Sequence, residues 1–385
     1  MVKTVDLVER SGALKAQLLE FSARPRYDQA RRDLLAAHGV HGVVRDQSQV
    51  INVLDHLLLQ HRLDNGQTIV EQFVAARPSL PAPEREMLLG WRDVVEGIFE
   101  INGHDDDALV VRSLIDELDY RVFCNMGPEM FRPLQVGSFL IARLVPVGDG
   151  WLLSGGLSLL RRRARDKAYR AAAGLATARP ELVFRNPYYL ERGWELQRED
   201  RDRFVRFFGT DMVRLPGTQL PELMREYHAF SRHEVLTRLA ARHETAHSTQ
   251  WPLPETSFPE ELVQSGTVAL IYDATEGLEI LAGFGDFERA FIDPEALSED
   301  HYRQRVLDYL DDDSVSPLPF RRMAEFDPIR AGEVLRLVLG CRRFDWHRQG
   351  ERLMRERKAS FFLRAQLPRV LPVGKRLAPY IAKAA

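Results

Sequence analysis

Residues 94–154 constrain the fold most, because they contain five short runs rich in β-branched and aromatic residues. The runs are VVEGIFEI, ALVVRSLID, DYRVFCNM, GSFLIARLVPV and GWLLSGG, and turn-forming sequences separate them. Short strands with regularly spaced turns are typical of a small barrel or a rolled sheet. The sequence Gly148-Asp149-Gly150 favours a tight hairpin between antiparallel strands. We therefore predict a small antiparallel five-stranded β-barrel over residues 91–158.

Barrels of the oligonucleotide-binding or SH3-like kind often contact nucleic acid or peptides. The fold alone does not decide between these ligands. A barrel of this size can equally serve to pack the two halves of the chain together. The sequence leaves both interpretations open.

The segments on either side carry apolar residues at helical spacing. In DQSQVINVLDHLLLQHRL, for example, Val50, Val53, Leu54 and Leu57 fall on one helical face. After the strands, LSLLRRRARDKAYRAAAGLATA indicates a long basic helix that starts near Leu157. We predict an α+β fold with four parts. They are an N-terminal helical bundle (1–90), the barrel (91–158), a helical middle segment (159–256) and a mixed α/β C-terminal region with a basic tail (257–385).

Cysteine usage and hydropathy indicate where the protein works. Cys124 and Cys341 are far apart in sequence, which argues for a reducing compartment and against both a disulfide framework and a thiolate zinc site. No run approaches the roughly 18 apolar residues of a spanning helix. The N-terminal MVKTVDLVERSGALKAQLLEF contains acids and no apolar signal core. We expect a cytoplasmic protein with no membrane partner, and its oligomeric state stays open.

Three stretches resemble a set of uncharacterised bacterial proteins, some of which end in a zinc-binding tail of the SEC-C type. They are GSFLIARLVPVGDGWLLSG, VALIYDATEGLEILAGFG and DDDSVSPLPFRRM. The cysteines of a SEC-C tail are absent from this sequence. The resemblance implies an outline of the fold and no activity.

Charge is unevenly distributed along the chain. Residues 341–385 hold twelve Lys or Arg against three acids, whereas residues 255–313 hold sixteen acids against three arginines. Such blocks either pair with each other or form a basic surface for nucleic acid or an acidic protein. For the second case, the candidate binding residues are Arg161, Arg162, Arg163, Arg165, Lys167, Arg170, Arg342, Arg343, Arg355, Arg357 and Lys358.

One motif suggests an alternative function. His243, Glu244 and His247 form H-E-x-x-H, which on a helix places two imidazoles on one face to bind zinc and a carboxylate beside them to act as general base. A catalytic zinc needs a third protein ligand, and Glu260, or its neighbour Glu261, is the nearest candidate. The resulting hypothesis is a zinc-dependent hydrolase resembling a metallopeptidase.

The sequence around the motif does not favour this alternative. Gln250 and Leu253 stand where an extended metalloprotease motif needs glycine and histidine, and several prolines separate the motif from Glu260. Histidines near the C-terminal end of a helix are also favoured by the helix dipole, without any metal. The sequence contains no phosphate-binding loop, nucleophile elbow or kinase signature. Enzymatic activity is therefore left open, and the cofactor is expected to be none or, in the alternative, zinc.

Overall fold

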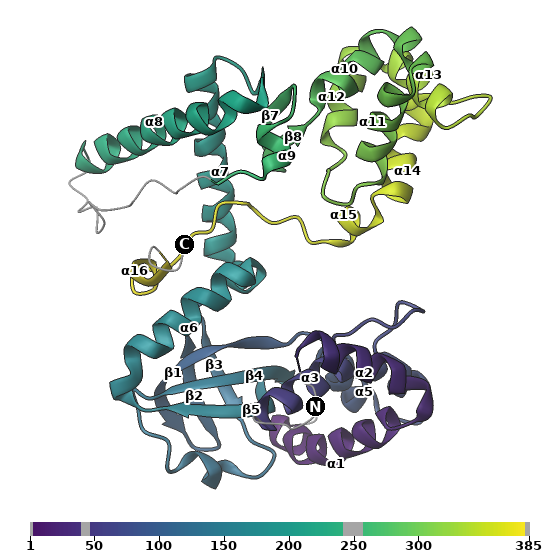
Figure 1. Ribbon diagram of the computed structural model, residues 1–385. Coiled ribbons are helices and arrows are strands. Elements are labelled where there is room, and N and C mark those ends of the chain that lie inside the picture. Colours follow the sequence, from purple (N-terminus) through teal and green to yellow (C-terminus); the bar gives the residue numbers. More distant parts are fainter. Residues whose placement is uncertain (1–2, 40–46, 242–256, 382–385) are drawn as a thin grey trace. The chain divides into compact units, whose positions relative to one another are not determined.

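The computed structural model describes residues 3–39, 47–241 and 257–381, and the chain divides into two compact units (Figure 1). Unit 1 comprises Met1–Tyr189 and Val373–Ala385, and unit 2 comprises Leu190–Pro372. The predicted mixture of helices and strands is confirmed. Within the described ranges, every helix is too short or too polar to cross a membrane.

Unit 1 begins with helices whose apolar faces pack on one another. They are α1 (Thr4–Ser22), α2 (Asp28–Ala37), α3 (Gln47–Leu59), α4 (Ile69–Ala75) and α5 (Ala82–Gly90). The start of α4 shows how the sequence sets these bounds. The Thr68 hydroxyl accepts a hydrogen bond from the Glu71 backbone at 3.3 Å, and the Glu71 carboxylate accepts one from the Thr68 backbone at 2.8 Å. This reciprocal capping box satisfies backbone donors that the first helical turn leaves free.

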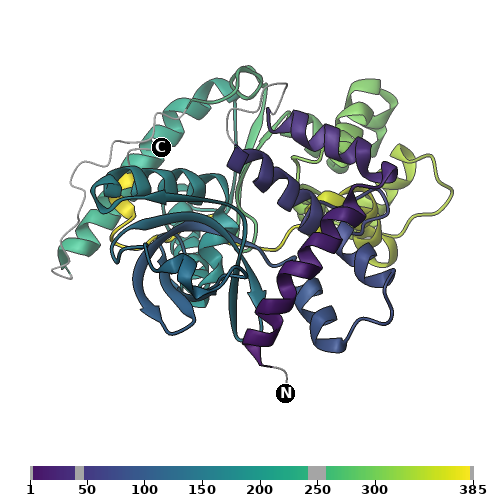
Figure 2. The same cartoon turned by 90° about the horizontal axis from the view of Figure 1, so that it is seen from below.

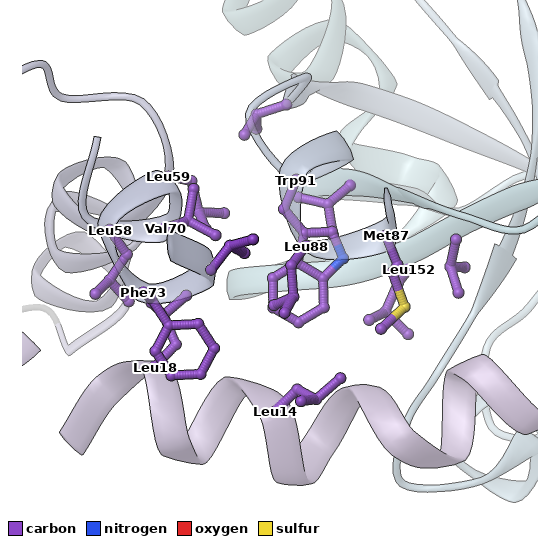
Figure 3. Packing of buried hydrophobic residues seen from close by; sticks show 14 of the residues in the cluster. Leu14, Leu18, Leu58, Leu59, Val70, Phe73, Met87, Leu88, Trp91 and Leu152 are labelled. Atoms are coloured by element: carbon purple, nitrogen blue, oxygen red, sulfur yellow. The ribbon is translucent and has the colours of Figure 1, made fainter. Parts of the chain in front are cut away.

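The helices and the sheet of unit 1 share a hydrophobic core. Figure 3 shows Leu14 and Leu18 of α1 close to Phe73 of α4 and Leu88 of α5, with Leu152 of the sheet in the same cluster. All five side chains are at most 4% exposed. The boundary predicted near residue 90 therefore falls inside unit 1, because neither the helices nor the sheet buries this apolar surface alone.

The sheet of unit 1 closes on itself. Its strands are β1 (Val95–Asp105), β2 (Ala108–Ser113), β3 (Asp119–Phe123), β4 (Phe139–Val147) and β5 (Gly150–Leu160). The strand order is β1-β2-β3-β5-β4, and β1 also pairs with β4. The first half of β1 pairs with β4 and its second half with β2, with a register shift between Ile101 and Gly103. Each strand thus has two hydrogen-bonded neighbours.

The prediction that all these strands pair antiparallel is wrong at one place. β3 and β5 are parallel, with Val122 opposite Trp151 and Phe123 opposite Leu152. The cause is the crossover of residues 124–138, which carries the chain from β3 to a position beside β1. β4 is then antiparallel to β1, and β5 returns between β4 and β3 in the direction of β3. The predicted hairpin at Gly148 is confirmed, because Val147 lies opposite Gly150.

The predicted long basic helix begins later than expected. Leu157 and Leu160 belong to β5, where Leu160 lies opposite Phe139 of β4, so they do not line a helix. A short 3-10 turn at Arg162–Ala164 leads into α6 (Arg165–Ala178). α6 contacts β1 and the C-terminal α16 (Ala378–Ile381), whereas α1, α3 and α5 contact β4 or β5. Figures 1 and 2 show α6 on a different side of the sheet from α1–α5.

Unit 2 begins within α7 (Pro187–Phe208) and contains a three-stranded antiparallel sheet. Its strands are β6 (Met212–Leu215), β7 (Val268–Asp273) and β8 (Gly277–Ala282), in the order β6-β7-β8. The central strand β7 lies between two cores. Ala269 and Ile271 belong to one core, and Val268, Leu270 and Tyr272 to the other. This alternation follows from the two-residue period of a strand.

Helices complete unit 2. They are α8 (Leu220–Ala241), α9 (Glu260–Val263), α10 (Phe284–Ile292), α11 (Asp300–Asp311), α12 (Leu318–Phe326), α13 (Pro328–Val338), α14 (Trp346–Arg357) and α15 (Ala359–Leu363). Two segments differ from the sequence-based expectation. β6 lies within the segment predicted to be helical, and α12 begins within DDDSVSPLPFRRM (311–323), a stretch whose composition favours a loop. A four-residue strand carries too little periodicity to be detected, and Pro319 in the first turn of α12 is compatible with a helix start.

Candidate anion-binding surfaces

The H-E-x-x-H motif lies outside the described residues, so His243, Glu244 and His247 are not placed here. Glu260, the candidate third ligand, is the first residue of α9. Its carboxylate accepts a hydrogen bond from the Gln264 side chain at 2.5 Å. Over residues 3–39, 47–241 and 257–381, no three His, Cys, Asp or Glu side chains are grouped as a metal would require. The zinc site stays a prediction.

The basic segment, residues 161–170, lies in unit 1 between β5 and the first turns of α6. All its candidate binding residues are exposed: Arg161, Arg162, Arg163, Arg165, Lys167 and Arg170. The apolar face of α6 fixes their direction, because Ala168 and Tyr169 are buried against the sheet and the charged positions face solvent.

Aromatic contacts hold one end of the basic segment in place. The Arg165 guanidinium lies 4.9 Å from the centre of the Tyr169 ring, and Tyr169 stacks on Tyr380 of α16 at 5.2 Å. The Tyr380 hydroxyl donates to Asp166 at 2.8 Å. Apart from Arg165, the cations of the segment make no ion pair or side-chain hydrogen bond within the described part of the chain. Their charges are therefore not neutralised locally.

The second predicted group, in the C-terminal part of unit 2, has mixed roles. Lys358 is fully buried, and its ammonium donates to the backbone carbonyls of Tyr309, at 2.6 Å, and Asp312. Burial lowers the pKa of Lys358, against the raising effect of nearby acids. The expectation that Lys358 forms part of a binding surface is wrong, because its donors are used inside the fold.

Two other members of this group have partners of their own. Arg357 pairs with Asp311 at 2.9 Å. Arg355 lies over the Phe362 ring at 4.9 Å. Arg355 and Arg357 both remain exposed. The ion pair of Arg357 with Asp311 fits the interpretation in which the acidic and basic blocks pair with each other.

Arg342 and Arg343 line a cleft of about 790 Å³ that we call the arginine basin. Its lining residues come from α13, α14 and the loop between them: Arg336, Arg342, Arg343, Phe344, Asp345, Arg348, Gln349 and Arg352. Five of the eight are arginines. Helical geometry brings Arg348 and Arg352 to one face, because they are four residues apart on α14.

The basin has few compensating charges. The single acid among its described lining residues, Asp345, caps α14 by accepting a hydrogen bond from the Arg348 backbone at 3.1 Å. Arg336 and Arg352 have loose ion pairs with a glutamate on their own helix, at 3.9 and 3.6 Å. Arg342, Arg343 and the Arg348 guanidinium have no ion pair or hydrogen bond in the residues that the structure describes. The cleft is therefore strongly electropositive.

Sequence reasoning identified two of the five basin arginines and missed Arg336, Arg348 and Arg352. The i, i+4 spacing of Arg348 and Arg352, just after the pair Arg342-Arg343, was the available signal. Arg336 could not be found this way, because only the packing of α13 on α14 brings it to the same cleft.

No family model, curated protein or solved structure matches the chain.

Proposed function

We propose that this protein binds nucleic acid, with the arginine basin of unit 2 as its main contact to the phosphate backbone. The observation that carries the proposal is the convergence of five arginines on one cleft, three of them without a partner in the described ranges. Like charges at this spacing repel one another, and a bound polyanion relieves that repulsion. The planar guanidinium also matches a phosphate group with two parallel hydrogen bonds.

The basic segment of unit 1 supplies a second contact surface in this proposal. Apart from Arg165, its cations resemble Arg342 and Arg343 in being exposed and in making no ion pair with a described residue. Each phosphate that a cation neutralises releases counterions, so every contact adds to a salt-dependent affinity. The two surfaces belong to different units, and we assign them separate contributions.

The proposal treats the closed sheet of unit 1 as a small barrel that supports the basic segment without itself binding the phosphates. Barrels of the oligonucleotide-binding kind use the face of their second and third strands. Here that face is already charge-paired, with Arg112 to Asp119 at 3.1 Å and Arg121 to Asp105 at 2.6 Å. Phosphates there would have to compete with these carboxylates.

A nucleic acid suits the basin better than an acidic protein does. Protein interfaces depend on apolar and aromatic anchors at a desolvated centre. Of the basin residues that the structure describes, Phe344 alone is aromatic, and it is half-buried in the core of unit 2. Backbone binding of nucleic acid needs mainly charge. We include a cytoplasmic location in the proposal, which the free thiols of Cys124 and Cys341 support.

The test is fluorescence anisotropy with labelled single-stranded RNA and duplex DNA at about 50 and 200 mM salt, with the full chain. A variant with Arg342, Arg343 and Arg348 changed to Gln should bind more weakly. Affinity falls as salt rises, and the loss of three phosphate contacts should make this dependence shallower. The negative slope of log affinity against log salt should become smaller in magnitude by roughly 2–3.

The matched control changes three exposed, ion-paired arginines of unit 2 to Gln: Arg206, Arg238 and Arg289. This control should leave the salt slope nearly unchanged. If both variants lost affinity for nucleic acid equally, binding would depend only on net charge, and the assignment to the basin would be contradicted. Absence of binding at the lower salt would overturn the proposed function. Binding of an acidic polypeptide but not of either nucleic acid would favour a protein partner instead.

A further inference from the structure

We infer that unit 1 contains a second, independent binding site, for a small organic monocarboxylate with an apolar body. The site is a cavity of about 340 Å³ between α1, α3 and the closed sheet, which is at the small end of the roughly 300–1,000 Å³ usual for ligand pockets. All the lining residues that the structure describes belong to unit 1. The inference uses none of the residues of the proposed nucleic-acid surfaces.

The walls of the cavity are mainly aliphatic. They are formed by Leu19, Ile51, Leu54, Leu58, Val145, Leu152, Leu153 and Trp91. Leu19 and Ile51 are 45% and 46% exposed, although both are large and apolar. Lining residues with this exposure form an apolar entrance, whereas Leu58 and Leu152 are buried in the core. An apolar ligand body entering here would remove the exposed surface of the first two from water.

A polar centre stands at one side of the cavity. Asp55 is buried, and its Oδ1 accepts from the Lys15 ammonium at 2.5 Å and the Ser154 hydroxyl at 2.7 Å. Its Oδ2 accepts from Arg143 Nε at 2.9 Å. Burial alone would raise the pKa of Asp55, but the charges of Lys15 and Arg143 and the hydrogen bonds from Lys15 and Ser154 keep it below its usual value. Asp55 is therefore an ionised acceptor whose two oxygens are already occupied.

The groups that remain available to a ligand are donors. The Lys15 ammonium has three N–H bonds; two are directed to Asp55 and Ser154, and its side chain is 24% exposed. Trp91 lines the cavity, but its indole Nε1 is buried from solvent and has no hydrogen-bond partner in the described residues, so this N–H is not a donor open to a ligand. The Asn125 amide also lines the cavity.

The charges decide the class of ligand. Among the described residues of the lining, Lys15 is the only cation and Asp55 the only anion. Asp55 is shared between Lys15 and Arg143, and Arg143 has a second carboxylate partner in Glu96. The charged lining group that keeps a free donor is therefore the Lys15 ammonium. A carboxylate accepts hydrogen bonds and offers none, which matches the ammonium and amide donors. An alkylammonium offers no acceptor and would place a cation beside Lys15, and an alcohol accepts with a single neutral oxygen, which makes a weaker hydrogen bond to the ammonium than a carboxylate does.

The experiment compares three probes of equal chain length: hexanoate, hexan-1-ol and hexylammonium. Binding to the full chain is measured by isothermal titration and by ligand-observed NMR. Hexanoate should bind most tightly. Lys15→Met should weaken hexanoate binding roughly tenfold, the usual value of one charge-assisted hydrogen bond, and should leave hexan-1-ol binding nearly unchanged.

A second variant tests whether a loss of binding comes from the site itself or from unfolding of unit 1. Ile51→Trp blocks the entrance from an exposed position and leaves the polar centre intact, so it should abolish hexanoate binding. Val5→Trp, at a similarly exposed apolar position of α1 that does not line the cavity, should bind like the unaltered chain. Equal or tighter binding of hexan-1-ol or hexylammonium would overturn the assignment to a carboxylate. Absence of hexanoate binding, or binding that persists in Ile51→Trp, would overturn the site.

Discussion

Replacing Asp55 with Asn should destabilise unit 1 more than any exposed carboxylate of the same unit. The Asp55 side chain is 2% exposed and that of Arg143 is 4% exposed, and their charged atoms are 2.9 Å apart. Arg143 also donates to Glu96 at 2.9 Å and to Gln60 at 2.7 Å. One substitution therefore perturbs a network that ties α3 to β1 and β4.

The magnitude follows from the charges left behind. In Asp55→Asn, Lys15 and Arg143 face each other without the anion that separates them. Breaking a buried ion pair costs about 3–5 kcal/mol, mostly because one charge stays buried without a partner. Lys15 is 24% exposed and is partly solvated, and Arg143 keeps Glu96. We therefore expect Asp55→Asn to lower the free energy of unfolding by about 3 kcal/mol, the lower end of that range.

The matched control is Asp119→Asn in the same unit. Asp119 pairs with Arg112 at 3.1 Å, but the two side chains are 55% and 38% exposed. Exposed pairs typically contribute about 0–1 kcal/mol. The expected contrast is thus at least about 2 kcal/mol between two chemically identical substitutions.

Hydrogen exchange with mass spectrometry measures this contrast on the full chain. Peptides from β4 and β5 report the free energy of opening of unit 1, and peptides from β7 and β8 serve as an internal control that should not change. Because the folded-state pKa of Asp55 is lowered, its stabilisation is present above the unfolded-state pKa of about 3.9 and is lost as the pH falls through the folded value. If Asp55→Asn lowered the free energy of opening of unit 1 no more than Asp119→Asn does, the reasoning would be refuted.

Two further predictions concern unit 2 and the unplaced motif. Burial raises the pKa of Glu279, whose Oε2 has no hydrogen-bond partner in the described ranges, so unit 2 should lose stability as the pH rises from about 4.3 through the folded-state pKa. Glu279→Gln should therefore raise the melting temperature at about pH 8 and not at about pH 4, and an equal effect at both would contradict this. For the motif, we expect elemental analysis to find no stoichiometric zinc, because no third ligand follows at a suitable spacing. One zinc per chain that disappears in His243→Ala would support the hydrolase instead.

Local patterns in the sequence predicted much of the fold. The spacing of apolar residues in 46–63 predicted α3, and the turn residues at Gly148 predicted the β4–β5 hairpin. These features depend on residues close together in the chain, so periodicity and turn chemistry reveal them. The parallel pairing of β3 with β5 depends on the path of residues 124–138 across the sheet. That path is set by tertiary packing and leaves no local signal.

The candidate sites were less predictable for the same reason. Charge counting identified Arg342 and Arg343, but the cleft they line also needs Arg336 from the preceding helix. Nothing in the sequence connected Lys15 of α1 with Asp55 of α3 or with Ser154 of β5. Residues that are far apart in sequence and differ in type form a site only when the core brings them together.

Net charge alone therefore overstates the basic surface of the C-terminal part. Lys358 contributes to the excess of cations in residues 341–385, yet two carbonyls bind its ammonium inside the fold. Arg357 is held by Asp311. What distinguishes Arg342 and Arg343 from these residues is the absence of a partner in the described part of the chain, together with their place on a cleft. A cation whose partner is supplied by the fold stabilises the protein, whereas a group of cations without partners costs stability until a ligand binds. We base the nucleic-acid proposal on that difference.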